Sequence, residues 1–120
     1  MTNQNNKEAL KDLANKYLDA FATKDLAALD GLLSEDVFLQ DPVIQLIEGK
    51  EKVLKSNEII FSNCKEIKFE TRNIFVDAEE STVTAQLVIS IDGTLVEVVD
   101  ILTVNSDLKI SGVKAYLDPR

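Results

Sequence analysis

Residues 82–104 carry the pattern that decides the fold, and they read TVTAQLVISIDGTLVEVVDILTV. Apolar side chains occupy alternate positions in the first ten residues, at Val83, Ala85, Leu87, Ile89 and Ile91. A period of two is typical of a strand with one buried face. Asp92-Gly93 predicts a tight turn, because both residue types tolerate positive φ. The alternation resumes in residues 94–104, so the stretch predicts an antiparallel β-hairpin.

The pattern on either side of this hairpin predicts two more strands and one long helix. Residues 67–76 and 109–117 alternate in the same way, the latter after a turn at residues 105–107. Near the amino terminus the period becomes 3.6, which predicts an amphipathic helix over residues 7–21. The apolar positions of that helix are Leu10, Leu13, Ala14, Tyr17, Leu18 and Phe21.

Two further helices are expected between the first helix and the strands. The second begins at Asp25, whose carboxylate can cap free backbone N–H groups, and ends near residues 34–36. An extended segment over residues 37–41 then precedes Pro42, which disfavours helix at the residue before it. A third helix is expected over residues 50–60. Helices followed by strands predict an α+β fold whose mainly antiparallel sheet curls around the helices.

The composition is that of one globular domain, which we expect to span residues 1–120. The formal charge is −8, and the 13 basic residues are scattered along the chain. This balance disfavours nucleic acid and anionic lipid surfaces as partners. No apolar run has the length of a signal-peptide core or a membrane span, so we expect a cytoplasmic protein that does not enter a membrane.

The absence of histidine limits the chemistry that the chain can perform. It removes Ser-His and Cys-His nucleophile pairs and the zinc motifs that need imidazole. The single cysteine, Cys64, has no neighbouring motif that would activate a thiolate, and we interpret it as structural. Acid-base chemistry must therefore use carboxylates, tyrosine or lysine, and no cofactor is expected.

Asp100 is the first polar residue that stands out. Period two places it on one strand face with four aliphatic residues, Val96, Val98, Leu102 and Val104. A carboxylate among such neighbours must find a partner or stay protonated. Staying neutral at pH 7 requires a pKa raised by ~3, or about 4 kcal/mol. A structural aspartate that hydrogen-bonds to a helix would explain the pattern equally well.

Asp41 and Tyr17 are two further candidates, each with an ordinary structural alternative. Asp41 shares its parity with Val37 and Leu39, which directs its side chain inward. Asp-Pro is also a common turn signal, and most such aspartates cap a loop. Tyr17 lies on the buried face of the first helix, where a core tyrosine usually places its hydroxyl at the rim.

Taken together, these residues resemble a known group of proteins. Tyr17-Leu18, Asp25-Leu26 and the sequence LLSEDVFLQDP of residues 32–42 resemble the amino-terminal signature of ketosteroid isomerases and polyketide-cyclase-like (SnoaL-like) proteins. Residues 99–102 (VDIL), 107–110 (DLKI) and 115–117 (AYL) resemble their carboxyl-terminal signature. The resemblance implies the nuclear-transport-factor-2-like fold, a cone-shaped curved antiparallel sheet wrapped around three N-terminal helices, with a pocket at the wide end.

The resemblance also implies roles for the three polar residues. In ketosteroid isomerases, a first-helix tyrosine and a late-strand aspartic acid held neutral form an oxyanion hole, and the aspartate of the Asp-Pro pair moves the proton. These roles would fall on Tyr17, Asp100 and Asp41 respectively. The sequence departs from the isomerases where supporting tyrosines and a late pocket aromatic are replaced. The supporting tyrosines are replaced by Leu33 and Asn57, and the late aromatic is replaced by Leu117. The expected substrate contacts are these three residues together with Val98 and Leu102.

Three functions follow as hypotheses. The first is an isomerase- or cyclase-like enzyme that moves a proton next to a carbonyl in a small apolar substrate, with phenolic compounds as analogues. The second is a non-catalytic small-ligand-binding module, which the missing tyrosines favour. The third is an interaction domain with a vestigial pocket, favoured by Val99 and Ile101 on the outer sheet face; these two residues also predict a homodimer. An open pocket that contains all three polar side chains would argue against the third.

Overall fold

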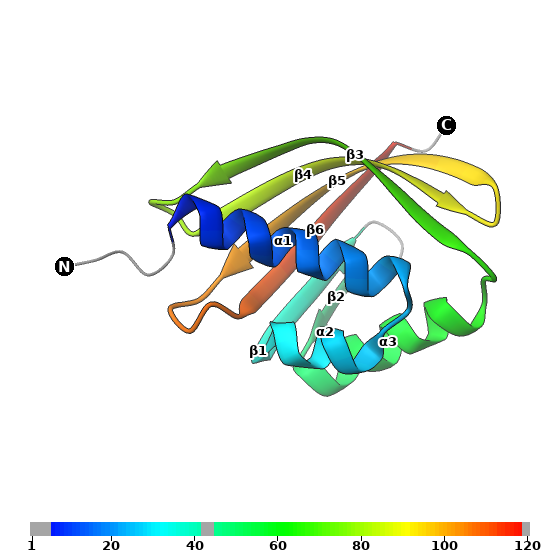
Figure 1. The fold of residues 1–120 in the computed structure, drawn as a ribbon. Helices are drawn as coiled ribbons and strands as arrows, with labels where there is room; N and C mark the ends of the chain where they lie inside the picture. Colours follow the sequence, from blue (N-terminus) through cyan, green and yellow to red (C-terminus); the bar gives the residue numbers. More distant parts are fainter. Residues whose placement is uncertain (1–5, 42–44, 119–120) are drawn as a thin grey trace.

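Three helices lie against one face of a curved β-sheet in the computed structural model, which describes residues 6–41 and 45–118 (Figure 1). The helices are α1 (Lys7–Ala22), α2 (Leu26–Leu32) and α3 (Lys50–Ser62). The strands are β1 (Leu33–Asp41), β2 (Gln45–Glu48), β3 (Ile67–Asp77), β4 (Thr82–Ile91), β5 (Thr94–Val104) and β6 (Ile110–Asp118). The predicted α+β class is therefore confirmed.

The sheet is mixed. In the part of the chain that the structure describes, its six strands run in the order β2-β1-β6-β5-β4-β3, and β2 and β3 form open edges. β1 is parallel to β6, whereas every other neighbouring pair is antiparallel. The predicted mainly antiparallel sheet is thus confirmed, and the β1–β6 pair is its parallel exception. Periodicity reports which face of a strand is buried, but it does not report the direction of its neighbour.

The boundary between α2 and β1 also differs from the prediction. The helix ends at Leu32, and β1 begins at Leu33, which pairs with Ile110 of β6. The pairing of β1 with β6 is irregular between Leu33 and Phe38, so Leu33 and Ser34 are both buried instead of alternating. The expected extended segment is the second half of this strand. β2 was not predicted because its side chains are mostly exposed, and Pro42 lies outside the described residues.

Side chains at the helix starts explain where α1 and α2 begin. The Asn6 Oδ1 atom accepts a hydrogen bond of 2.8 Å from the Ala9 backbone N–H at the start of α1. The Asp25 Oδ1 atom accepts one of 3.0 Å from Ala28 in α2, so the predicted cap is confirmed. Such caps satisfy backbone donors that a helix cannot pair internally.

The turn between β4 and β5 has the predicted form. Asp92 has φ 50° and Gly93 has φ 88°, as a two-residue hairpin turn requires. The Asp92 carboxylate accepts hydrogen bonds of 2.8 Å from the backbone N–H groups of Lys65 and Glu66. These bonds fasten the hairpin tip to the loop that follows α3.

The core lies between the helices and the inner face of the sheet (Figure 1). α1 packs against β3 and β4, and α3 packs against β1 and β2. Within the described residues, the buried polar or charged side chains are Ser34, Asn57 and Asp100. No helix within residues 6–41 and 45–118 has the length and apolarity needed to cross a membrane.

Candidate functional site

A cavity of about 180 Å³ lies between α1, α3 and the inner face of the sheet. Its polar lining residues are Tyr17, Asp41, Asn57 and Asp100. Its apolar lining residues are Phe21, Leu39, Ile60, Phe69, Ile89, Ile91, Val98, Val113, Ala115 and Leu117. The cavity therefore presents a few polar groups within an apolar wall, which is the usual composition of a small-molecule site.

The strand register leaves room for the carboxyl group of Asp100. In β5, Asp100 is in register with Ala85 of β4 on one side and with Ala115 of β6 on the other. Alternation places all three side chains on the inner face. Because both neighbours are alanines, the carboxyl group is flanked by small side chains and borders the cavity.

Burial makes the ionised form of Asp100 unfavourable. The residue is only 8% exposed. This burial, followed by the negative charge of Asp41, raises the pKa of Asp100 to about 7. Removal of a carboxylate from water and repulsion by a second carboxylate both favour the protonated form. Below pH 7 Asp100 is therefore mainly a neutral acid, which can donate a hydrogen bond.

Tyr17 supplies a second O–H donor at the cavity. It lies on the inner face of α1 and is buried. Burial, followed by the negative charge of Asp100 when that group is ionised, raises the pKa of Tyr17 well above its ordinary value. The phenol therefore keeps its proton throughout the neutral pH range, and Tyr17 and protonated Asp100 line the same cavity as donors.

Asp41 and Asn57 complete the polar part of the lining. Asp41 is the last residue of β1, is half-buried and pairs with Gln45 of β2. Its negative charge is the second cause, after burial, of the raised pKa of Asp100. Asn57 lies on α3 and is 3% exposed. Its amide can both donate and accept hydrogen bonds, so it adds a polar contact that does not titrate.

Six of the eight site residues expected from the sequence line this cavity: Tyr17, Asp41, Asn57, Val98, Asp100 and Leu117. The other two, Leu33 and Leu102, are buried core residues that do not line it. Leu33 pairs with Ile110 at the start of β1, whereas Asp41 ends the same strand. We therefore do not retain Leu33 or Leu102 as ligand contacts.

Sequence reasoning missed several apolar lining residues. Phe21 lies four residues after Tyr17 on the same helix, a spacing that places both side chains on one face. Ile89 and Ile91 share the inward parity of β4. These signals identify an inward face, but they do not distinguish the part that borders a cavity from the part that is fully packed.

The described residues also bear on metal binding. Within residues 6–41 and 45–118, no group of three or more acidic or thiol side chains is placed to hold a metal ion. The cavity itself contributes the carboxyl groups of Asp41 and Asp100. The arrangement is suited to proton transfer and hydrogen bonding by side chains.

Comparisons with known proteins place the chain in a family. A search of curated proteins found no significant match. Among solved structures, the chain is similar to a putative ketosteroid isomerase from Kribbella flavida, with a TM-score of 0.82, 20% identity, and 94% of this chain and 80% of that one covered. It is also similar to an epoxide hydrolase of LEH-like type from M. tuberculosis, with a TM-score of 0.81, 15% identity, and coverage of 92% and 84%.

A third similar structure is an NTF2-like protein of unknown function from Cytophaga hutchinsonii, with a TM-score of 0.77, 20% identity, and 92% and 91% coverage. These neighbours share the fold at low sequence identity, and fold alone does not determine a reaction. The family model for the SnoaL-like domain matches residues 14–113. The chain therefore belongs to the SnoaL-like domain family, and it shares its fold with NTF2-like structures.

Proposed function

We propose that the cavity binds a small apolar carbonyl compound and that the protein moves a proton at the carbon next to its carbonyl group. Asp41 is the base, and Tyr17 and protonated Asp100 donate hydrogen bonds to the enolate oxygen. The observation that carries the proposal is Asp100, a buried carboxyl group with a pKa of about 7 in a cavity shared with Tyr17 and Asp41. Perturbed acids in clefts are frequent at functional sites.

The two carboxyl groups differ in burial, as their different roles of base and hydrogen-bond donor require. Asp41 is the more exposed of the two, and its negative charge contributes to keeping Asp100 protonated. Asp41 is then available to accept a proton while Asp100 donates a hydrogen bond, as expected when two acids lie in different environments. A positioned base contributes typically 10²–10⁴-fold to the rate, and donors aimed at the developing oxyanion add to this.

Ligand binding tests the oxyanion part of the proposal. Phenol resembles an enolate at its oxygen, so its affinity should be measured by calorimetry at neutral pH. Asp100→Asn retains a donor and should retain much of the affinity. Asp100→Leu should lose on the order of 1.5–3 kcal/mol, the range for hydrogen bonds to charged groups. Carbon-13 NMR that finds the Asp100 carboxyl group ionised below about pH 5, both free and with phenol bound, would exclude this role.

Proton exchange tests the catalytic part. Small cyclic ketones in heavy water should lose their α-protons faster with the protein than with buffer, as followed by proton NMR. Asp41→Asn should reduce this exchange by about 10²-fold or more, within the range of general-base effects. Exchange no faster than in buffer, together with intact phenol binding, would identify a non-catalytic binding module instead.

The binding module is the second candidate because the polar network is short. Of the two positions where the isomerases carry supporting tyrosines, one is Leu33, which does not line the cavity, and the other is Asn57, which does. The third candidate, an interaction domain with a vestigial pocket, receives less support, since the cavity is lined by all three polar side chains.

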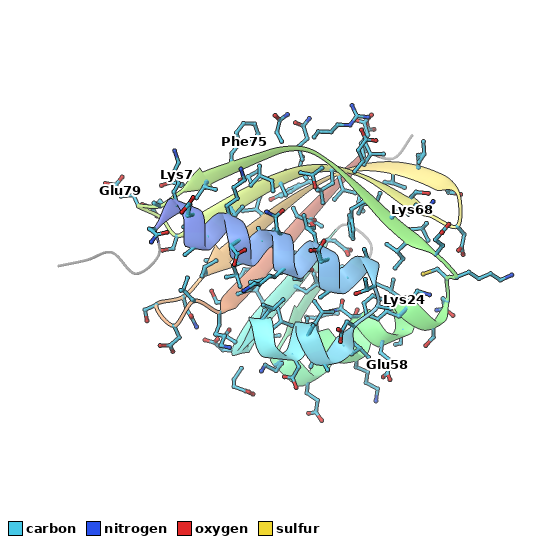
Figure 2. The ribbon with its side chains drawn as sticks, viewed as in Figure 1. Lys7, Lys24, Glu58, Lys68, Phe75 and Glu79 are labelled. Atoms are coloured by element: carbon cyan, nitrogen blue, oxygen red, sulfur yellow. The ribbon has the colours of Figure 1, made fainter. Side chains whose placement is uncertain are left out.

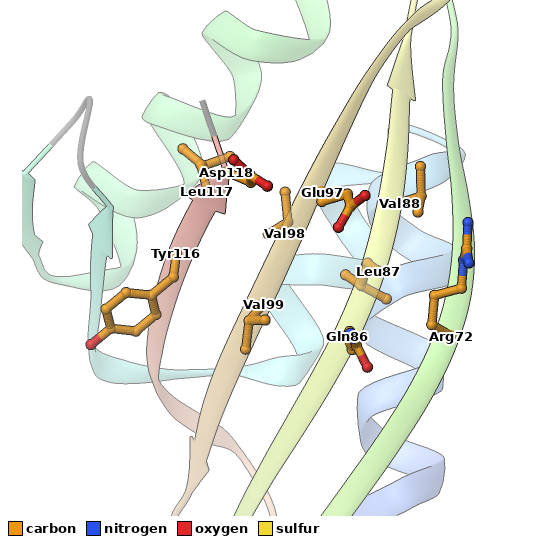
Figure 3. Close-up of a pocket in the computed structure, with 10 residues that line it drawn as sticks. All are labelled: Arg72, Gln86, Leu87, Val88, Glu97, Val98, Val99, Tyr116, Leu117 and Asp118. Carbon is orange, nitrogen blue, oxygen red and sulfur yellow. The ribbon is translucent and has the colours of Figure 1, made fainter. Parts of the chain in front are cut away.

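We also propose a homodimer through the outer sheet face. Val99 and Tyr116 are in register on β5 and β6, and Tyr116 is 55% exposed. Figure 3 shows both at a hollow on this face, with Arg72 and Glu97 at the same hollow. A two-fold interface brings the same patch of two copies together, so apolar contacts and opposite charges can be matched across it.

A further inference from the structure

The cavity is small for the pocket of a ligand-binding protein. Its volume is about 180 Å³. Pockets for drug-sized ligands enclose ≈ 300–1,000 Å³, whereas an engineered apolar cavity of about 150 Å³ accepts benzene. We propose that the site takes a ligand with a single ring, or a chain of similar bulk, and that Phe21 sets this limit. The chemistry of that ligand rests on the proposed function, but the size limit rests on the cavity alone.

Phe21 forms the wall beside the proposed oxyanion donors. It follows Tyr17 by one helical turn on α1, and the centroids of the two rings are 6.2 Å apart. Both side chains line the cavity. A ligand whose oxygen meets the Tyr17 hydroxyl therefore has the Phe21 ring next to its carbon skeleton.

Two further rings hold Phe21 in place. The Phe61 ring of α3 lies 5.0 Å away, centroid to centroid, at an interplanar angle of 77°. The Phe69 ring of β3 lies 5.9 Å away at 70°. Edge-to-face pairs of this geometry are favourable beyond the area they bury. A different Phe21 rotamer would break both contacts, so the ring acts as a fixed wall.

The sheet side of the cavity is less able to move. Its lining side chains project from strands that are paired in register, such as Ile89 with Val96 and Asp100 with Ala115. The hydrogen bonds between these strands fix the Cα positions from which the side chains project. Shortening Phe21 is therefore the direct way to enlarge the site without disturbing the residues that carry the chemistry.

Toluene and naphthalene test the limit without using the polar groups, because neither contains oxygen. Binding can be followed by NMR from the methyl signals of Ile89 and Ile91. In the wild type, toluene should shift these signals, and naphthalene should bind no more than about threefold tighter than toluene. A pocket that enclosed the whole second ring would favour naphthalene by more than about tenfold, given the apolar area buried.

Phe21→Ala should raise the preference for naphthalene over toluene by about tenfold or more. Phe75→Ala is the matched control, because Phe75 is 59% exposed on β3 and lies outside the cavity (Figure 2); it should leave the ratio unchanged. Phe21→Leu should give a smaller gain in the same direction, and it decides the question if circular dichroism shows that Phe21→Ala is unfolded.

Three results would overturn the size limit: no toluene binding to the wild type, naphthalene binding more than about tenfold tighter to the wild type, or an unchanged ratio in the folded Phe21 variants. Phenol separates this outcome from the proposed function. If Asp100→Leu leaves phenol affinity unchanged while the hydrocarbon ratios behave as expected, the oxyanion role fails and the size limit stands.

Discussion

Replacing Asp100 with asparagine should stabilise the folded protein at neutral and alkaline pH. The pKa of Asp100 is raised from 3.8 to about 7 in the folded state, chiefly by burial. An acid with a raised folded-state pKa contributes stability that is fully present below its unfolded pKa and is lost as the pH rises through its folded pKa. The asparagine variant has no such proton and should not lose this stability.

The size of the effect follows from the two pKa values. Between about pH 4 and pH 7 the native state holds a proton on Asp100 that the unfolded state has released, so the free energy of unfolding falls by about 1.4 kcal/mol per pH unit. The whole window corresponds to on the order of 4 kcal/mol. The advantage of Asp100→Asn over the wild type should therefore grow across this window and level off above about pH 7.5.

Urea unfolding followed by far-ultraviolet circular dichroism measures this difference. The wild type and Asp100→Asn should be compared at closely spaced pH values from about pH 4.5 to pH 8.5, which spans most of the window. Asp107→Asn, at an exposed position in the β5–β6 turn, controls for the chemical change itself. A stability difference that stays flat across the window for Asp100→Asn, or grows no more than in the control, would refute the reasoning.

Asp41 provides an internal check on the same experiment. Its negative charge is the second cause of the raised pKa of Asp100, after burial. Asp41→Asn should therefore lower the pKa of Asp100 towards its ordinary value and move the end of the window to lower pH. The advantage of Asp100→Asn, measured in the Asp41→Asn background, should be smaller above pH 7. An unchanged advantage would mean that burial alone acts on Asp100.

Three further predictions test other parts of the structure. Asp92→Ala should lower the thermal midpoint, because the Asp92 carboxylate accepts two backbone hydrogen bonds from the loop after α3. These hydrogen bonds lower the pKa of Asp92. The loss of stability should therefore be larger at pH 7 than at low pH, where the wild-type carboxylate is protonated. A Cβ atom at Gly112 would overlap the Phe38 ring. Gly112→Ala should therefore lower the free energy of unfolding in urea by about 1–3 kcal/mol, and by less in a Phe38→Leu background. An equal loss in both backgrounds would contradict the contact. Light scattering should give about twice the mass of one chain, and the double variant Val99→Lys, Ile101→Lys should be monomeric; a monomeric wild type would end the dimer proposal.

The fold could largely be predicted because its main signals are local. The 3.6-residue period of α1 and the two-residue period of β4 and β5 each report one buried face, and the Asp92-Gly93 turn has few alternatives. β1 was only partly recognised, since its irregular pairing with β6 buries Leu33 and Ser34 in succession. Its parallel orientation depends on a partner more than seventy residues away in the sequence, which no local pattern reports.

The polar part of the site could be predicted for a different reason. Asp100 violates the apolar pattern of its strand face, and such a violation is visible in the sequence because a buried carboxyl group is costly. Phe21 and Ile60 obey the pattern of their helices and therefore carry no comparable signal. The same uniformity led to Leu102 being expected at the site, although it lies in the packed core. Cavity boundaries depend on side-chain packing in three dimensions, which parity alone does not encode.

Two measurements on one variant can settle whether Asp100 is functional or structural. In either case, the buried and ionised carboxyl group lowers the stability of the folded state above pH 7, so Asp100→Asn should be more stable than the wild type there. The cases differ in what Asp100→Leu loses. If the carboxyl group is structural, Asp100→Leu should leave phenol affinity within about twofold of the wild type and should lose stability, because the group that hydrogen-bonds to the carboxyl group would be left unpaired. If it is an oxyanion donor, Asp100→Leu should gain stability and lose about tenfold or more in phenol affinity. A residue that lowers the stability of the folded state and raises the affinity for an enolate analogue is explained by function, because packing alone would favour leucine.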